Sequence, residues 1–135
     1  MKETIFLYDT KNDKFYELDK IGLCVEDGMK YSDNDMDFYK LILSMYGSQY
    51  EKKRMDIERR YKDARENNKF DAFIVLTHSL KGESRGIGAG ELGELFYELE
   101  KAGKAKDIEK IDLYYDKTIN MWKELCESIN SFSIQ

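Results

Sequence analysis

Apolar residues recur at three- and four-residue steps through most of this chain, and no proline interrupts them. Leu92, Leu95, Phe96 and Leu99, for example, follow the i, i+3, i+4, i+7 spacing that places side chains on one face of an α-helix. A proline inside a helix costs about 3 kcal/mol, so its absence favours long uninterrupted helices. The pattern therefore predicts an all-α fold.

The same periodicity divides the chain into one short helix and four longer ones. The predicted helices span residues 21–31, 32–66, 70–81, 92–102 and 108–129. Because single amphipathic helices cannot bury their apolar faces alone, the four longer ones are expected to form an antiparallel up-down four-helix bundle. One domain is expected at 21–135, preceded by an N-terminal extension at 1–20 that could form a hairpin or a lid.

Five features are expected to punctuate these helices. Ser32 is predicted to cap the long helix at 32–66, and Asp107 is predicted to cap the last helix. Gly47 is predicted to be a weak point, since glycine costs about 1 kcal/mol against alanine inside a helix. Gly103 is predicted to close the helix at 92–102. The glycines between 86 and 90 are expected to mark a break or a tight connection between helices.

Composition excludes several classes of function. The net charge of -5 argues against nucleic-acid binding, which requires clustered cations. Cys24 and Cys126 are far apart, and a single histidine cannot complete an ordinary zinc site, so no bound metal is expected. No apolar run approaches the roughly 20 residues of a membrane span, and the N-terminus lacks a signal-peptide pattern. We expect a cytoplasmic, monomeric protein with reduced thiols, without membrane insertion.

His78 is the only histidine of the chain, and its neighbours suggest a chemical role. At about 100° per residue, it falls about 120° from the centre of the apolar face of helix 70–81, so its ring should be accessible to solvent. A neutral imidazole has a lone pair that can attack phosphorus. Lys81 could offset the charge of an attached phosphoryl group, and Gly82 has no side chain to obstruct a docking partner.

The residues around His78 also resemble a known family. His78-Ser79-Leu80-Lys81-Gly82, followed by Ile87-Gly88-Ala89, Leu92 and 98–103, closely resembles the H-x-L-K-G pattern of histidine-containing phosphotransfer (HPt) domains. The similarity covers roughly residues 21–130, including 25–29 and 35–39, which resemble the leading helix of the family and the start of its first bundle helix. Arg85 and Gly86 depart from the small or polar residues that the family often has there.

The resemblance implies a carrier in a two-component phosphorelay and not an enzyme. His78 would accept a phosphoryl group and pass it to or from the aspartate of response-regulator receiver domains, Lys81 would stabilise that group, and Gly82 would give access. The receiver would supply the aspartate and a bound Mg²⁺, and this chain would carry no cofactor. A hybrid sensor histidine kinase is a further expected partner. From the helical spacing, Asp71, Val75 and Arg85 are expected to line the partner-binding surface.

Two other functions remain as alternatives. An HPt-like bundle could act as an interaction module without transferring phosphate. An enzyme could use Glu91 as its nucleophile in the 86–91 loop, which would require 73–77 to be a strand. From its first and last residues the chain is expected to be free-standing, with a module cut from a sensor kinase as the alternative.

Overall fold

The computed structural model describes residues 19–20 and 22–133, and every long regular element among them is an α-helix. The helices are α3 (Val25–Tyr31), α4 (Met36–Ser48), α5 (Tyr50–Asn67), α6 (Asp71–Gly86), α7 (Gly90–Lys104) and α8 (Ile108–Ser133). The all-α prediction is thereby confirmed for the described part of the chain. The hairpin or lid predicted at 1–20 lies outside the described residues, except for residues 19 and 20.

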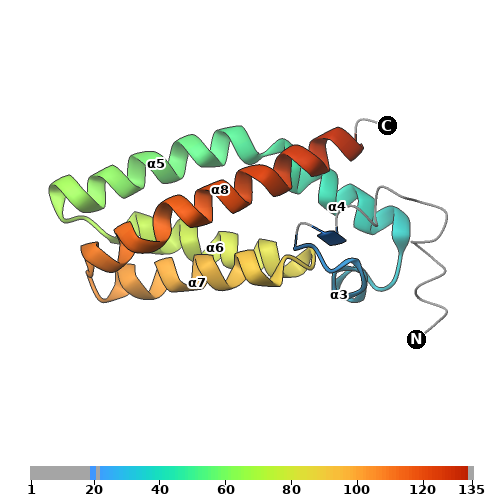
Figure 1. The fold of residues 1–135 in the computed structure, drawn as a ribbon, viewed down its shortest axis with the longest axis horizontal. Coiled ribbons are helices and arrows are strands. Elements are labelled where there is room, and N and C mark those ends of the chain that lie inside the picture. The colour runs from blue at the N-terminus through green and yellow to red at the C-terminus, as the bar shows by residue number, and fades with distance from the viewer. Residues whose placement is uncertain (1–18, 21, 134–135) are drawn as a thin grey trace.

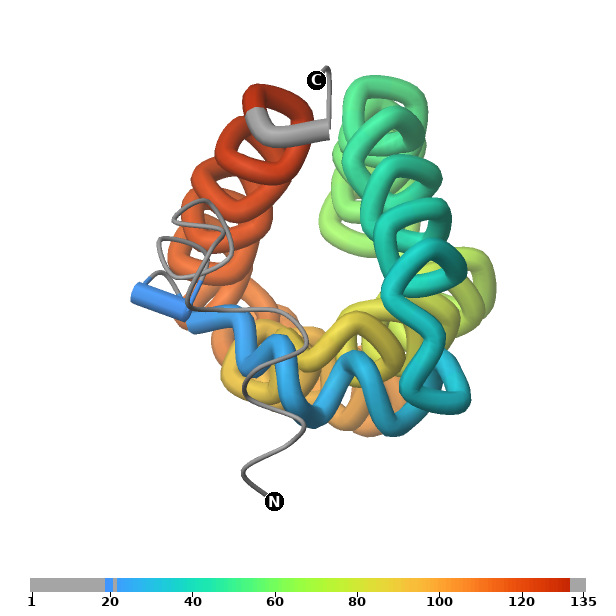
Figure 2. The backbone as a smooth tube through the Cα atoms, turned by 90° about the vertical axis from the view of Figure 1, so that its right-hand side faces the viewer, coloured from blue at the N-terminus to red at the C-terminus, as the bar shows by residue number. Residues whose placement is uncertain are grey.

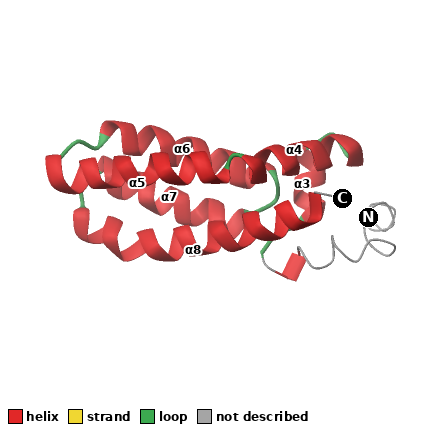
Figure 3. Cartoon of the chain, turned by 90° about the horizontal axis from the view of Figure 1, so that it is seen from above, coloured by secondary structure: helices red, strands yellow, loops and turns green. Residues whose placement is uncertain are grey.

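Helices α5, α6, α7 and α8 run alongside one another, as Figures 1 and 3 show. Helix α4 extends the direction of α5, and α3 lies at the same end of the molecule as α4 (Figure 1). Figure 2 shows the molecule along the helices. In this view α8 lies on one side and α4 with α5 on the other, and α6 and α7 lie between the two sides. The apolar faces of all these helices meet in one core.

The helix predicted at 32–66 is two helices that meet at Gln49. The backbone N–H of Gln49 donates to the carbonyl of Met45 at 3.2 Å, and the N–H of Lys53 donates to the carbonyl of Gln49 at 3.0 Å. Because helical hydrogen bonds continue on both sides of Gln49, the residues of α4 and α5 follow nearly one helical path.

The predicted cap at Ser32 is wrong. Ser32 is buried just after the end of α3, and Asp35 caps α4 instead. The Oδ1 atom of Asp35 accepts hydrogen bonds from the backbone N–H groups of Asp37 at 3.0 Å and Phe38 at 3.2 Å. Asp107 does cap α8 as predicted, since its Oδ1 accepts from the N–H of Lys110 at 3.1 Å. Asp, Asn and Ser have similar capping preferences, so residue type alone could not choose between Ser32 and Asp35.

Gly103 does not end α7, which continues to Lys104. A Cβ atom at position 103 would lie 3.0 Å from Cγ1 of Ile74 and 3.3 Å from a ring carbon of Phe73. Gly47 is likewise inside α4, where a Cβ would meet the side chain of Asn130. Both glycines thus allow a neighbouring helix to approach closely, which is a requirement of packing between helices and not of either helix alone.

The predicted break between 86 and 90 is confirmed as a short connection between α6 and α7. Gly88 adopts φ +91°, a backbone conformation that L side chains rarely adopt. Its carbonyl accepts a hydrogen bond of 2.8 Å from the N–H of Cys24, which leads into α3. The hydroxyl of Tyr39 on α4 donates to the carbonyl of Ile87 at 2.9 Å. The connection therefore anchors both α3 and α4, and it fixes the end of the helix that carries His78.

Candidate functional site

His78 lies on α6, on the side of that helix turned away from the core. Thr77 and Leu80 are buried, whereas the side chain of His78 is 66% exposed. The apolar face of α6 packs against the other helices, and residues about 120° from its centre remain at the surface. The structure thus places the imidazole where the helical spacing predicted it.

The ring of His78 contacts a buried carboxylate. The Nδ1 atom of His78 lies 2.9 Å from Oε2 of Glu100 on α7, and the Glu100 side chain is only 2% exposed. The ammonium group of Lys81 lies 2.8 Å from Oε1 of the same carboxylate, and that of Lys104 lies 3.1 Å from Oε2. A buried charge is tolerated only when it is paired, and here one carboxylate has three partners.

The surroundings of Glu100 keep its carboxylate ionised. Burial by itself would raise its pKa, but Lys81, His78 and Lys104 together outweigh burial and lower the pKa from 4.5 to about 2. An ionised carboxylate can only accept hydrogen bonds, so Nδ1 of His78 must carry the hydrogen. In the neutral ring, Nε2 then holds the lone pair, and no described residue forms a hydrogen bond with it.

Lys81 belongs to the group of side chains around Glu100, and its ammonium group is not freely exposed. Its side chain is only 15% exposed, and its Nζ atom lies 4.8 Å from the centre of the Tyr97 ring. Lys101 and Arg85 also approach that ring, at 4.5 Å and 5.5 Å. Cations near the face of an aromatic ring are attracted by its quadrupole, so Tyr97 organises the positive charges beside the site.

The remaining predicted site residues lie near His78 on α6, in different surroundings. A Cβ atom added to Gly82 would have no atom within 4 Å, so the surface one turn from His78 is open. Val75, also one turn away, is 64% exposed. Asp71 is exposed in the first turn of α6. Arg85 forms an ion pair of 3.0 Å with Glu94, so part of its charge is already compensated.

Glu100 was not identified as a site residue from the sequence, although one signal was present. Glu100 follows Leu99 and lies four residues after Phe96, so helical spacing places it on the edge of the apolar face of α7. A carboxylate in such a position needs a buried partner. The identity of that partner depends on the pairing of α6 with α7, which the sequence pattern did not provide.

Three further features were sought in the described part of the chain: a metal site, the strand of the enzyme alternative and a membrane-spanning helix. Among residues 19–20 and 22–133, no group of three His, Cys, Asp or Glu side chains could hold a metal ion. Residues 73–77, which the enzyme alternative requires as a strand, lie within α6. None of the described helices is long and apolar enough to cross a membrane.

Comparison of the chain with known proteins finds no matching family model, no similar curated protein and no similar solved structure.

Proposed function

We propose that this protein is a histidine phosphotransfer protein of a two-component phosphorelay, in which His78 carries the phosphoryl group on Nε2. One observation supports the proposal most strongly. The exposed ring of His78 is held through Nδ1 by the buried carboxylate of Glu100, which leaves Nε2 without a hydrogen-bond partner among the described residues, and the surface at Gly82 is open one turn away. We infer further that α4 with α5, α6, α7 and α8 form the antiparallel up-down four-helix bundle of the HPt family.

The chemistry that we propose is a direct transfer between aspartate and histidine. The lone pair of Nε2 forms a bond to phosphorus while the bond between phosphorus and the aspartate oxygen of a receiver domain breaks. The aspartate leaves as a carboxylate, and the imidazole ring, which keeps its hydrogen on Nδ1, becomes positively charged. Transfer to a second receiver reverses these bond changes.

The carboxylate of Glu100 fits this step in two ways. Its hydrogen bond with Nδ1 selects the tautomer that has a lone pair on Nε2, and its negative charge stabilises the positive ring that forms. Because its pKa is about 2, Glu100 stays ionised at any pH near neutrality. Lys81 and Lys104, which pair with the same carboxylate, place positive charge next to the phosphoryl group.

The cytoplasm is the expected compartment, and receiver domains or a hybrid sensor kinase are the expected partners. The test is phosphotransfer profiling of the chain against a panel of phosphorylated receiver domains. We expect acid-labile phosphohistidine on the parent and none on His78→Gln. If the variant accepts label as well as the parent does, the proposal fails. If receivers bind both proteins equally and transfer to neither, the chain is an interaction module.

A further inference from the structure

A groove runs between α5 and α6, on the other side of α6 from His78. Two hollows form it, and both are lined by Arg59 on α5. Leu76 borders one hollow and Ala72 borders the other, so the groove follows α6 over more than one helical turn. At about 100° per residue, Leu76 lies about 160° around α6 from His78, so the proposed phosphorylation site does not use this groove.

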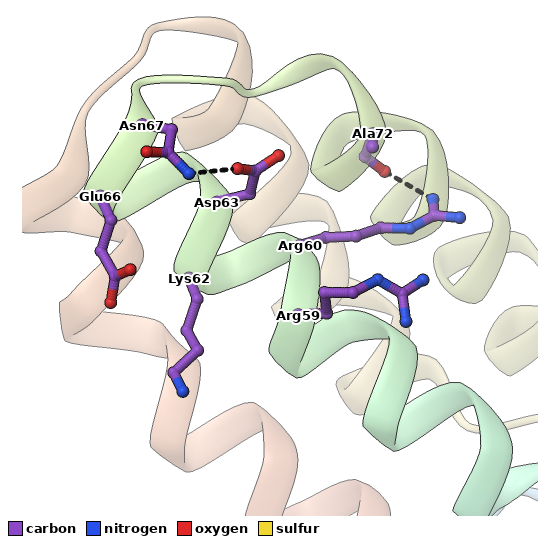
Figure 4. Close-up of a pocket in the computed structure, with 7 residues that line it drawn as sticks. All are labelled: Arg59, Arg60, Lys62, Asp63, Glu66, Asn67 and Ala72. Carbon is purple, nitrogen blue, oxygen red and sulfur yellow. Dashed lines mark hydrogen bonds between the residues drawn. The ribbon is translucent and has the colours of Figure 1, made fainter.

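One face of α5 presents its side chains along this groove. Lys52, Met55, Arg59 and Lys62 line it, and their spacing of i, i+3, i+7 and i+10 places them on a single stripe. All four are exposed. Arg59 and Lys62 both line the hollow nearer the end of α5, and Figure 4 shows that their side chains extend in different directions from that helix. The stripe is therefore available to a molecule that lies along the groove.

The charge of the groove is opposite to that of the whole protein. Five cationic and three acidic side chains line it, which gives a net charge of +2 in a chain whose net charge is -5. The cations are Lys52, Lys53, Arg59, Arg60 and Lys62.

Two of these five cations form no ion pair with the described residues, one near each end of the stripe. Lys53 pairs with Glu83 at 2.8 Å, and Arg60 pairs with Asp56 at 3.0 Å while also donating to the carbonyl of Ala72 at 2.7 Å. Arg59 pairs with Asp56 as well. Lys52 and Lys62, in contrast, form no ion pair with any of the described residues.

An apolar surface separates these two lysines. The side chain of Met55 is 62% exposed and lines the same hollow as Leu76. Methionine is flexible and polarizable, and it adapts to differently shaped apolar groups. The groove therefore offers a cation, then an apolar surface, then a mixed region in which three cations lie with Asp63 and Glu66.

We propose that this groove binds an extended acidic segment of a partner protein. Lys52 and Lys62 are ten residues apart, which is about 15 Å along a helix. An extended chain covers that distance in about five residues, since each residue spans about 3.3 Å. The segment has acidic side chains about five positions apart, and an apolar side chain between them contacts Met55 and Leu76.

Charge pattern favours a protein segment over a nucleic acid. Asp56, Asp63 and Glu66 also line the groove, and these carboxylates would repel a continuous row of phosphates. A peptide can place its carboxylates opposite the lysines and leave neutral residues opposite the acids. The inference does not depend on phosphotransfer, so binding in the groove is expected for His78→Gln as for the parent.

The probe for this proposal is a labelled twelve-residue peptide with Gly-Ser flanks and the central sequence Glu-Ser-Leu-Ser-Ser-Glu, together with the same peptide reversed. Fluorescence anisotropy measures the affinity, and amide chemical shifts locate the site. We expect at least one of the two peptides to bind, with shifts concentrated in residues 49–67 and 72–76. Affinity should fall severalfold between 50 mM and 300 mM salt, because exposed charges are screened.

Two variants with the same change of charge make the test specific. The double variant K52E/K62E should weaken binding about tenfold or more, since two attractions become repulsions. The control K117E/K123E reverses two exposed lysines of α8 that form no ion pair with described residues, and it should leave the affinity within about twofold. Circular dichroism checks that both variants remain helical.

Three results would overturn the proposal. The first is that neither peptide binds at 50 mM salt. The second is that K117E/K123E weakens binding as much as K52E/K62E does, which would mean nonspecific attraction. The third is that a single-stranded RNA of twelve nucleotides produces the same shifts at lower concentration than the peptides do.

Discussion

The Nδ1 atom of His78 lies 2.9 Å from Oε2 of Glu100, so an exposed ring on α6 is fixed by a buried carboxylate on α7. The same carboxylate binds Lys81 at 2.8 Å and Lys104 at 3.1 Å. Any change at Glu100 therefore alters the ring, the charge beside it and the contact between two helices together.

The exchange Glu100→Gln should slow phosphotransfer to His78 by about 10- to 100-fold, the range found when the carboxylate that orients a metal-bound histidine is lost. The amide keeps the size of the side chain, but it removes the negative charge that stabilises the positive ring. Rates of label transfer from a phosphorylated receiver measure the effect.

The matched control is Glu98→Gln on the same helix. Glu98 pairs with Lys101 at 3.2 Å and with Lys110 at 3.7 Å, and neither cation contacts His78. We expect its transfer rate to stay within about twofold of the parent. Equal slowing by both exchanges would show that the effect comes from α7 as a whole and not from the Glu100–His78 contact.

Glu100 should also make stability depend on pH. Its folded-state pKa of about 2 is below its unfolded value of 4.5, so its stabilising contribution is present above about pH 4.5 and is lost as the pH falls toward 2. The contribution is up to about 3 kcal/mol, given 1.36 kcal/mol per unit of pKa shift. Urea unfolding of the parent and Glu100→Gln at pH 7, 4 and 3 measures it.

The difference in free energy of unfolding between these two proteins should be largest at pH 7 and smaller at pH 3. Comparison of the two proteins cancels the titration of the other carboxylates, which both of them share. A difference that stays constant from pH 7 to pH 3 would show that Glu100 is not held ionised by its three partners.

The exchange Gly82→Ala should stabilise the protein by about 0.5–1 kcal/mol, because a Cβ there meets no atom and alanine is the better helix former. If Gly82 provides access to His78, the same exchange should slow transfer from a receiver. Urea unfolding and transfer rates together test both effects. A variant that is more stable and transfers at the parent rate would remove Gly82 from the docking surface.

The exchange Gly28→Ala on α3 should have the opposite effect on stability. A Cβ there would lie 2.5 Å from the carbonyl oxygen of Ile87, and it would also meet the ring of Tyr39. The backbone at Ile87 cannot move aside as a side chain can, so we expect a loss of about 1–3 kcal/mol. Thermal unfolding measures the loss, and an unchanged midpoint would show that α3 can shift without cost.

The exchange Val75→Asp should weaken the binding of a receiver domain without unfolding the protein. Val75 is 64% exposed and lies one turn from His78, so its replacement costs little apolar burial. We expect a free energy of unfolding within about 0.5 kcal/mol of the parent. Isothermal titration with a receiver that transfers to His78 measures the binding, and unchanged affinity would exclude Val75 from the interface.

The sequence by itself determined the helices and the face on which His78 lies. Apolar spacing and the absence of proline specify helical segments, because both act through contacts within a few residues of each other. Three other features depend in the same way on residues close together in the chain, and the structure has each of them as predicted. They are the exposure of His78, the open surface at Gly82 and the cap at Asp107. The cap at Ser32 failed because Asp35, three residues on, is an equally good cap.

Only the tertiary structure decided which residues meet across helices. Gly103 and Gly47 looked like an end and a weak point along the chain, but both are places where a second helix approaches closely. The pairing of Glu100 with His78 joins residues 22 positions apart, and it exists only because α6 and α7 pack side by side. Contacts between helices depend on the shapes of both helix surfaces, because the side chains of one helix fit between those of the other. The apolar periodicity of a sequence describes the surface of only one helix at a time.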